Sequence, residues 1–198
     1  MNTRVFAAIG AVAAAAASVT AAPLNLTQAF PDIYSNFTST SYNAASGAFT
    51  AEGWSSSLTT TGGFYDSIFG TFVLSATIDN DGNLVGGTIE ITGSIAALGY
   101  NSGTLLTGNL TAFGFQTNGS QTFEFLFDVT GGDAASIFGP VGGVILHDTG
   151  FAGSFDASFN TQMLASSDTF TVQVVPLPIA GATGLAGLAL VAARRRRA

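Results

Sequence analysis

The chain has 198 residues with no Cys and no Lys, and its five basic residues are Arg4 and the run from Arg194 to Arg197. All twelve acidic residues lie between Asp32 and Asp168, so the central region carries a net charge of −12 when its single His is neutral. A domain without cations cannot neutralise phosphate groups, which excludes nucleic-acid binding. The lack of Cys excludes thiol catalysis, thiolate zinc sites and disulfides.

Residues 1–22 have the pattern of a secretory signal peptide. Arg4 is followed by an apolar, Ala-rich stretch over 5–19 and by small residues at 20–22. Signal peptidase cleaves after small residues in this context, so we expect the mature chain to begin at Pro23, or one residue earlier. A buried Ala-rich helix is the alternative, and the lack of an amphipathic face argues against it.

The region 23–174 is predicted to be one all-β domain outside the cytoplasm. Apolar and polar residues alternate with period 2, the pattern of strands with one buried face, in five segments: 72–78, 89–95, 123–129, 151–159 and 170–174. Further strands are expected near 33–43, 47–58, 103–116 and 141–148. The one plausible helical stretch, 134–138, is broken by Gly139 and Pro140.

About eight or nine short antiparallel strands predict a β-sandwich or a closed β-barrel. The Phe residues on the apolar faces should supply most of the core. We expect the polar faces, including Glu124 on one strand and Glu90 on another, to be in contact with solvent.

Asp79, Asp81 and Asn83 offer oxygen ligands at alternate positions, as calcium-binding loops do. The EF-hand pattern needs Gly at the sixth position and Glu at the twelfth, whereas here Gly82 is fourth and Glu90 is twelfth. A tight hairpin turn explains the same residues. We therefore expect no cofactor, with calcium at these three residues as the alternative that the sequence leaves open.

Few residues could support catalysis. His147 is the only His and is followed by Asp148, but no G-x-S-x-G nucleophile motif accompanies them. Glu90 and Glu124 could in principle act as a glycosidase pair. The sequence indicates no pocket that would raise the pKa of either, so we expect the protein not to be an enzyme.

The C-terminal 24 residues contain three features in a fixed order. The first is the Pro-containing motif of Val175, Pro176, Leu177, Pro178 and Ile179. The second is an apolar stretch over 179–193, and the third is the cluster Arg194, Arg195, Arg196 and Arg197. A helix of 15 residues is about 22 Å long, short of the ~30 Å hydrocarbon core, and the long arginine side chains extend its reach. Four arginines resist translocation, so we expect a transmembrane helix with the body outside and the arginines in the cytoplasm. A buried C-terminal helix is the alternative.

This order resembles the PEP-CTERM class of sorting signals, and most closely the variant whose motif is V-P-L-P-A, from which Ile179 departs. The resemblance covers about residues 175–198. It implies recognition by an exosortase, a membrane enzyme that cuts near the motif and passes the body to the cell surface or matrix. Signal peptidase would be the other processing partner, and the inner membrane would hold the chain transiently.

The sequence thus favours an exported, non-enzymatic surface or matrix protein that could bind glycans or self-associate. A secreted carbohydrate- or lipid-binding β-module is the alternative, with its ligand held by sheet-face aromatics such as Trp54, Phe64 and Tyr65. An unrecognised hydrolase is less well supported. An outer-membrane barrel is a further alternative, against which the terminal arginines and the short apolar stretch argue.

Overall fold

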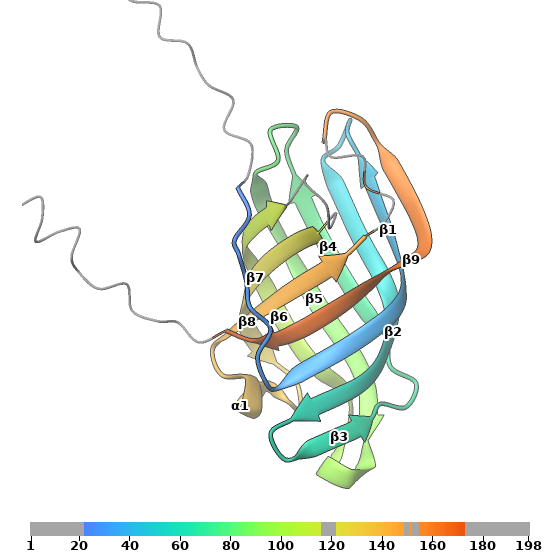
Figure 1. Cartoon of the computed structure of the whole chain (residues 1–198), viewed down its shortest axis with the longest axis vertical. Coiled ribbons are helices and arrows are strands. Elements are labelled where there is room, and N and C mark those ends of the chain that lie inside the picture. Colours follow the sequence, from blue (N-terminus) through green and yellow to red (C-terminus); the bar gives the residue numbers. More distant parts are fainter. Residues whose placement is uncertain (1–21, 116–121, 149–150, 152–154, 173–198) are drawn as a thin grey trace, which may run out of the picture.

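The computed structural model describes residues 22–115, 122–148, 151 and 155–172 (Figure 1). Nearly all of this chain is extended. The elements, in chain order, are β1 (Asp32–Asn43), β2 (Ala48–Thr60), β3 (Gly63–Asp66), β4 (Phe72–Ile78), β5 (Leu84–Ile95), the 3₁₀ turn η1 (Ala96–Leu98), β6 (Tyr100–Phe115), β7 (Thr122–Gly131), α1 (Ala135–Phe138), β8 (Val141–His147) and β9 (Phe159–Thr171).

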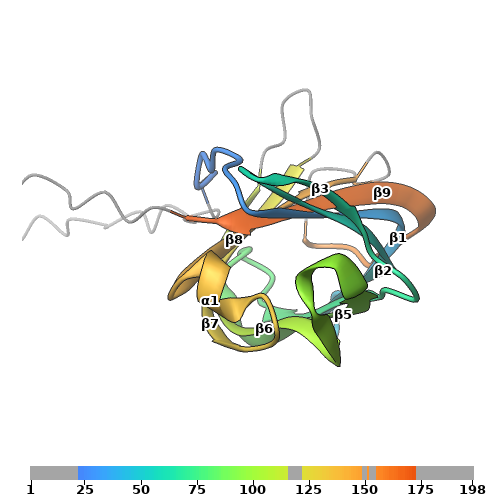
Figure 2. The same ribbon diagram turned by 90° about the horizontal axis from the view of Figure 1, so that it is seen from below.

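Eight strands form a closed antiparallel barrel in the order β1-β9-β8-β7-β6-β5-β4-β2, and the pairing of β1 with β2 completes the ring. Strand β2 pairs along its first half with β4 and along its second half with β3, so β3 extends the wall at the lower end. Closure satisfies the backbone groups that open sheet edges would expose. Of the two predicted architectures, the barrel is therefore confirmed. Figure 2 shows the barrel from below, with α1 at this end.

Phenylalanine rings fill the barrel, as the sequence predicted. An eight-stranded barrel has an interior just wide enough to be filled by side chains. Ring centroids of Phe113 and Phe125 are 4.7 Å apart, as are those of Phe123 and Phe151. The ring of Phe127 lies directly over two glycines of the neighbouring strands, Gly108 and Gly142. A Cβ at these glycines would come within 2.2 Å and 2.1 Å of the ring, so the close approach requires glycine.

Part of the wall formed by β9, β1 and β2 is different, because hydroxyl groups take several of its buried positions. Ser167, Ser35 and Ser55 pair across these three strands in one row. All three are buried, as are Thr38 and Thr169. Their hydroxyl oxygens have no hydrogen-bond partner within the described part of the chain. The barrel interior therefore combines an apolar core, to which Phe49 of β2 contributes, with a patch of unpaired hydroxyls on the β9–β1–β2 wall.

Residues 22–31 run across the outer face of β7, β8 and β9 before β1 begins (Figure 1). The carboxylate of Glu124 on β7 accepts hydrogen bonds from the backbone N–H groups of Asn25 and Leu26, at 2.9 and 3.0 Å. Glu124 is only 3% exposed. The prediction that Glu124 faces solvent is therefore wrong, because this covering segment, called here the strap (residues 22–31), has no strand pattern that would indicate where it lies.

Most strand predictions are confirmed, but the one over 151–159 is wrong. Of this segment, residue 151 and residues 155–158 are described and are not strand, and β9 begins only at Phe159. Phe151 and Phe155 are nevertheless buried, with ring centroids 5.3 Å apart and both packed on Phe115. These rings reach the core from the connection between β8 and β9. The alternation of apolar residues in this segment therefore reflects the burial of side chains and not strand pairing. The predicted short strand 170–174 is the end of the longer β9 as far as the structure describes it.

Candidate functional site

A groove follows the outer face of β1 and β2. Its first stretch has a volume of about 340 Å³ and is lined by both aromatic and polar groups: Phe37, Ser39, Glu52, Gly53, Trp54, Thr71, Phe72, Val73 and Met163. Its second stretch, toward the β1–β2 turn, measures about 160 Å³ and is polar: Ser39, Thr40, Ser41, Thr50, Glu52 and Asn160. Since Ser39 and Glu52 line both stretches, they form one continuous surface.

Bulges in β1 and β9 build the apolar side of the groove. Around Phe37 the register of β1 shifts against both neighbours, and its backbone has a φ of 50°. Opposite it, β9 inserts extra residues around Met163, whose φ is 55° and whose N–H donates to the Ser39 hydroxyl at 3.1 Å. A bulge re-aims side chains relative to regular alternation. As a result Phe37 and Met163 both point away from the core and are largely exposed.

Gly53 lets the bulged strand approach β2. A Cβ at Gly53 would lie 2.3 Å from the Thr38 hydroxyl oxygen and 3.0 Å from the Asn36 carbonyl oxygen, so only glycine fits. Its neighbours Glu52 and Trp54 lie two residues apart and therefore share the outer face. Trp54 is 65% exposed in a described region that contains no Lys or Arg. The groove thus combines a bare aromatic surface with a carboxylate and several hydroxyls.

A second pocket, of about 400 Å³, lies at the lower end of the barrel. It is formed where the strap, the end of β2, η1 and α1 meet: Phe30, Pro31, Thr60, Thr61, Leu98, Tyr100 and Ile137. Its polar lining is limited to hydroxyls and backbone. It lies beside the end of β9, because Thr171 donates from its N–H to the Pro31 carbonyl at 3.1 Å and from its hydroxyl to the Phe138 carbonyl at 2.6 Å.

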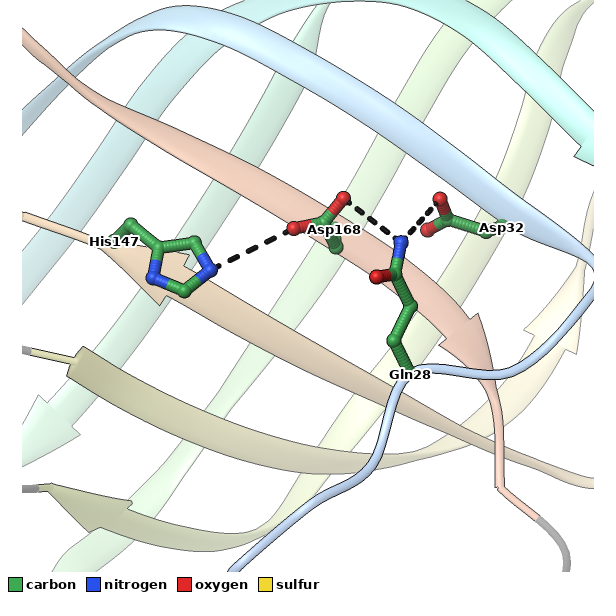
Figure 3. A network of polar contacts seen from close by, with 4 residues as sticks. All are labelled: Gln28, Asp32, His147 and Asp168. Atoms are coloured by element: carbon green, nitrogen blue, oxygen red, sulfur yellow. Dashed lines mark hydrogen bonds and ion pairs between the residues drawn. The ribbon is translucent and has the colours of Figure 1, made fainter. Parts of the chain in front are cut away.

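A polar cluster fastens the strap to the barrel (Figure 3). The Gln28 side-chain amide donates to Asp32 at 2.8 Å and to Asp168 at 3.1 Å. His147 Nε2 lies 3.7 Å from the other oxygen of Asp168. Burial, and next the negative charge of Asp168, raise the pKa of Asp32 to about 7, although the Gln28 hydrogen bond opposes this shift. One carboxyl of the cluster therefore titrates near neutral pH, within a contact that holds the strap in place.

The candidate catalytic residues are not brought together. His147 is exposed and faces Asp168, whereas Asp148 is buried and accepts hydrogen bonds from the hydroxyls of Thr40 and Thr161, the latter at 3.0 Å. His147 ends β8, in agreement with its interpretation as a strand-end residue. Glu90 is exposed on β5, while Glu124 lies under the strap on β7, with β6 between the two strands. Neither pair has the proximity that acid–base catalysis requires.

At the calcium candidate, the Asp79 carboxylate closes its own turn. It accepts hydrogen bonds from the N–H groups of Asn83 and Asp81, at 2.7 and 3.1 Å, and from the Asn83 side-chain amide at 3.2 Å. These bonds, with the Asn83 N–H first, hold the pKa of Asp79 below its ordinary value. Among the described residues no three acidic or His side chains form a metal-ligand group. The hairpin-turn interpretation accounts for this geometry.

The aromatic residues named from the sequence are separated. Trp54 lies in the groove, Phe64 is exposed on β3 outside it, and Tyr65 packs partly against the core. Two further residues of the groove, Phe37 and Met163, were not predicted from the sequence. The only signal for them was the interrupted alternation in these two segments.

The predicted signal peptide 1–22 falls outside the described residues except for Ala22, and the sorting motif, the apolar stretch 179–193 and Arg194 to Arg197 fall wholly outside them. Within the described ranges, no helix is long and apolar enough to span a membrane.

Fold and site together define an all-β protein with a closed eight-stranded antiparallel barrel, a phenylalanine core and a mixed aromatic and polar groove on its outer face. Comparison of the chain with models of protein families, with curated proteins and with solved structures finds no match.

Proposed function

We propose that the chain is an exported, non-enzymatic protein of the cell surface or extracellular matrix, sorted through an exosortase-type C-terminal tail. The observation that carries this proposal is the ordered tail of motif, apolar stretch and arginine cluster. The separation of the candidate acid–base pairs supports the non-enzymatic part.

The extent of the barrel is consistent with removal of both predicted segments. All eight wall strands lie between Asp32 and Thr171, inside the predicted mature body 23–174. The last described residue, Val172, still donates its N–H to the Val141 carbonyl at 3.2 Å. The predicted motif begins three residues later, at Val175. Processing at either end would leave the wall whole.

The test compares three chains in cells that contain an exosortase: the full chain, a chain ending at residue 174, and a chain with Arg194 to Arg197 replaced by Gln. We expect the full chain at the cell surface or in the matrix. Without its tail, the body should be released from the membrane fraction, because nothing retains it for the enzyme. The arginine variant should lose surface delivery, because the charges that stop translocation are gone.

Ile179→Ala provides the control, since it restores the usual residue of the resembling motif and should leave delivery unchanged. Identical fractionation of the full and tail-less chains would refute the sorting role. Cytosolic activity of a reporter fused before Val175 would refute export itself.

The groove favours a second candidate function, that of a secreted carbohydrate- or lipid-binding module. This function does not exclude the first, because a protein of the matrix acts outside the cell on whatever its surface binds.

A further inference from the structure

The first stretch of the groove offers an aromatic face next to hydrogen-bonding groups. Trp54 and Phe37 are both largely exposed, and Glu52, Ser39 and Thr71 lie around them. A flat ligand with apolar faces and a polar edge could stack on the rings while its hydroxyls bond to the carboxylate and the hydroxyls. A sugar ring has this shape and chemistry.

We propose that this groove binds an uncharged polysaccharide. The proposal deepens the second candidate function and does not depend on the sorting tail. Trp54 and Phe37 provide the stacking surface, and Glu52 accepts hydrogen bonds from sugar hydroxyls. The polar second stretch, with Ser41, Thr50 and Asn160, binds the continuation of the same glycan chain.

Charge selects the class of glycan. The described body contains no Lys or Arg, and the charged group in the groove is the carboxylate of Glu52. Uronate, sulfate or phosphate groups would meet repulsion from this carboxylate and from the net negative body. A neutral sugar meets no such repulsion and uses the carboxylate as a strong hydrogen-bond acceptor.

The shape of the groove favours a chain over a single sugar. From Trp54 to Thr50, four residues along β2, the groove extends about 14 Å at the rise of an extended strand. The two stretches share Ser39 and Glu52, so a ligand passes from the aromatic part to the polar part without interruption. Affinity should therefore rise with oligosaccharide length until both stretches are filled.

A lipid chain fits the same surface less well. Glu52, Ser39 and Thr71 are distributed among the apolar lining, and covering them with hydrocarbon would remove water without replacing its hydrogen bonds. Sugar hydroxyls do replace those bonds. Vesicle binding is accordingly an outcome of the test that contradicts the proposal.

The chain contains a built-in probe, because Trp54 is its only tryptophan. The protein is purified from cells expressing the full chain, in the processed form that they deliver. Neutral oligosaccharides of one to six glucose, mannose, galactose or N-acetylglucosamine units are titrated while tryptophan emission is recorded. Alginate and heparin oligosaccharides and phosphatidylcholine vesicles form the comparison arms. We expect a saturable emission change with at least one neutral series, growing tighter with length and insensitive to salt.

Variants test whether the glycan binds in the groove or elsewhere on the surface, with binding measured by calorimetry. Trp54→Ala should weaken binding about tenfold or more, and Phe37→Ala should weaken it less. Phe64→Ala is the matched control: Phe64 is 63% exposed, nearly the same as Trp54, but does not line the groove. It should bind as the unchanged protein does. Circular dichroism confirms that each variant keeps its strands.

Three results would overturn the proposal: no saturable binding by any neutral series, equal binding by Trp54→Ala and the unchanged protein, or binding of only the anionic glycans or the vesicles. None of these bears on the tail, whose failure would appear in fractionation alone. A sorting defect with intact glycan binding would refute the first function and leave this site standing.

Discussion

Single residues on the inner wall of β9, β1 and β2 reduce the stability of this barrel. The hydroxyls of Ser35, Ser55 and Thr169 are buried without a hydrogen-bond partner in the described chain. A buried polar group left unpaired costs about 1–3 kcal/mol. The packed rings of the core must offset this cost.

Thr169→Val should therefore stabilise the protein, by about 1 kcal/mol, because it replaces the unpaired hydroxyl with a methyl of the same shape. Chemical denaturation would show a higher midpoint. Thr161→Val is the matched comparison and should have the opposite effect, because the Thr161 hydroxyl donates to the buried Asp148. If both variants shift the midpoint in the same direction, hydrogen-bond pairing is not the cause.

Asp32 makes stability depend on pH. Its pKa is about 7 in the fold, well above the ordinary value of 3.8, so between these values the folded state holds a proton that the unfolded state releases. The contribution of this carboxyl to stability is therefore greatest below about pH 4 and falls as pH rises through 7. Asp32→Asn removes the charge. We expect the variant to gain stability relative to the unchanged protein as pH is raised from 4.5 to 8, measured by denaturant midpoints at both values. A difference independent of pH would contradict this assignment.

At the scale of elements, the strap is fastened to the barrel by a carboxylate. Glu124 accepts hydrogen bonds from two consecutive backbone N–H groups, of Asn25 and Leu26. Hydrogen bonds to charged groups each contribute about 1.5–3 kcal/mol. The strap covers the outer face of three strands, yet it pairs with none of them as a strand.

Glu124→Ala should release the strap while leaving the barrel folded. Hydrogen exchange at the amides of Asn25 and Leu26 should accelerate by tenfold or more, whereas amides in the centre of β6 should change little. Glu90→Ala, which removes an exposed glutamate from β5, is the control and should leave the strap amides protected. Retained protection in Glu124→Ala would show that the remaining contacts of the strap, including the hydrogen bonds of Gln28, hold it without this carboxylate.

Period-2 alternation predicted the strands that carry large apolar residues inward, such as β4 and β7. It failed for most of β9, where Thr161, Ser167 and Thr169 point inward and give no hydropathy signal. The bulge at Met163 also shifts the phase of the alternation. Conversely, Phe155 looked like a strand residue because burial alone produces the same pattern.

At the scale of the whole molecule, the number of strands was predictable but their closure was not. The barrel closes at β1, which pairs with both β2 and β9, and this place of closure is called here the seam. Strand β9 lies more than a hundred residues beyond β1 in the chain. Local patterns do not encode such partners. The groove was predictable only in part for the same reason. Trp54 was a candidate from the sequence because it is an aromatic residue on a predicted strand. Phe37 and Met163 reach the groove only through two bulges that face each other between β1 and β9.

The seam has a consequence for how the body becomes complete. Strand β1 gains its second neighbour only when β9 is present. A chain that ends between β8 and β9 therefore has two open sheet edges, on β1 and β8, that can pair with strands of other molecules. The barrel can therefore close only after the chain as far as Thr171, the end of β9, has left the ribosome or the translocation channel. Termination before β9 would yield an open, association-prone sheet rather than a smaller barrel.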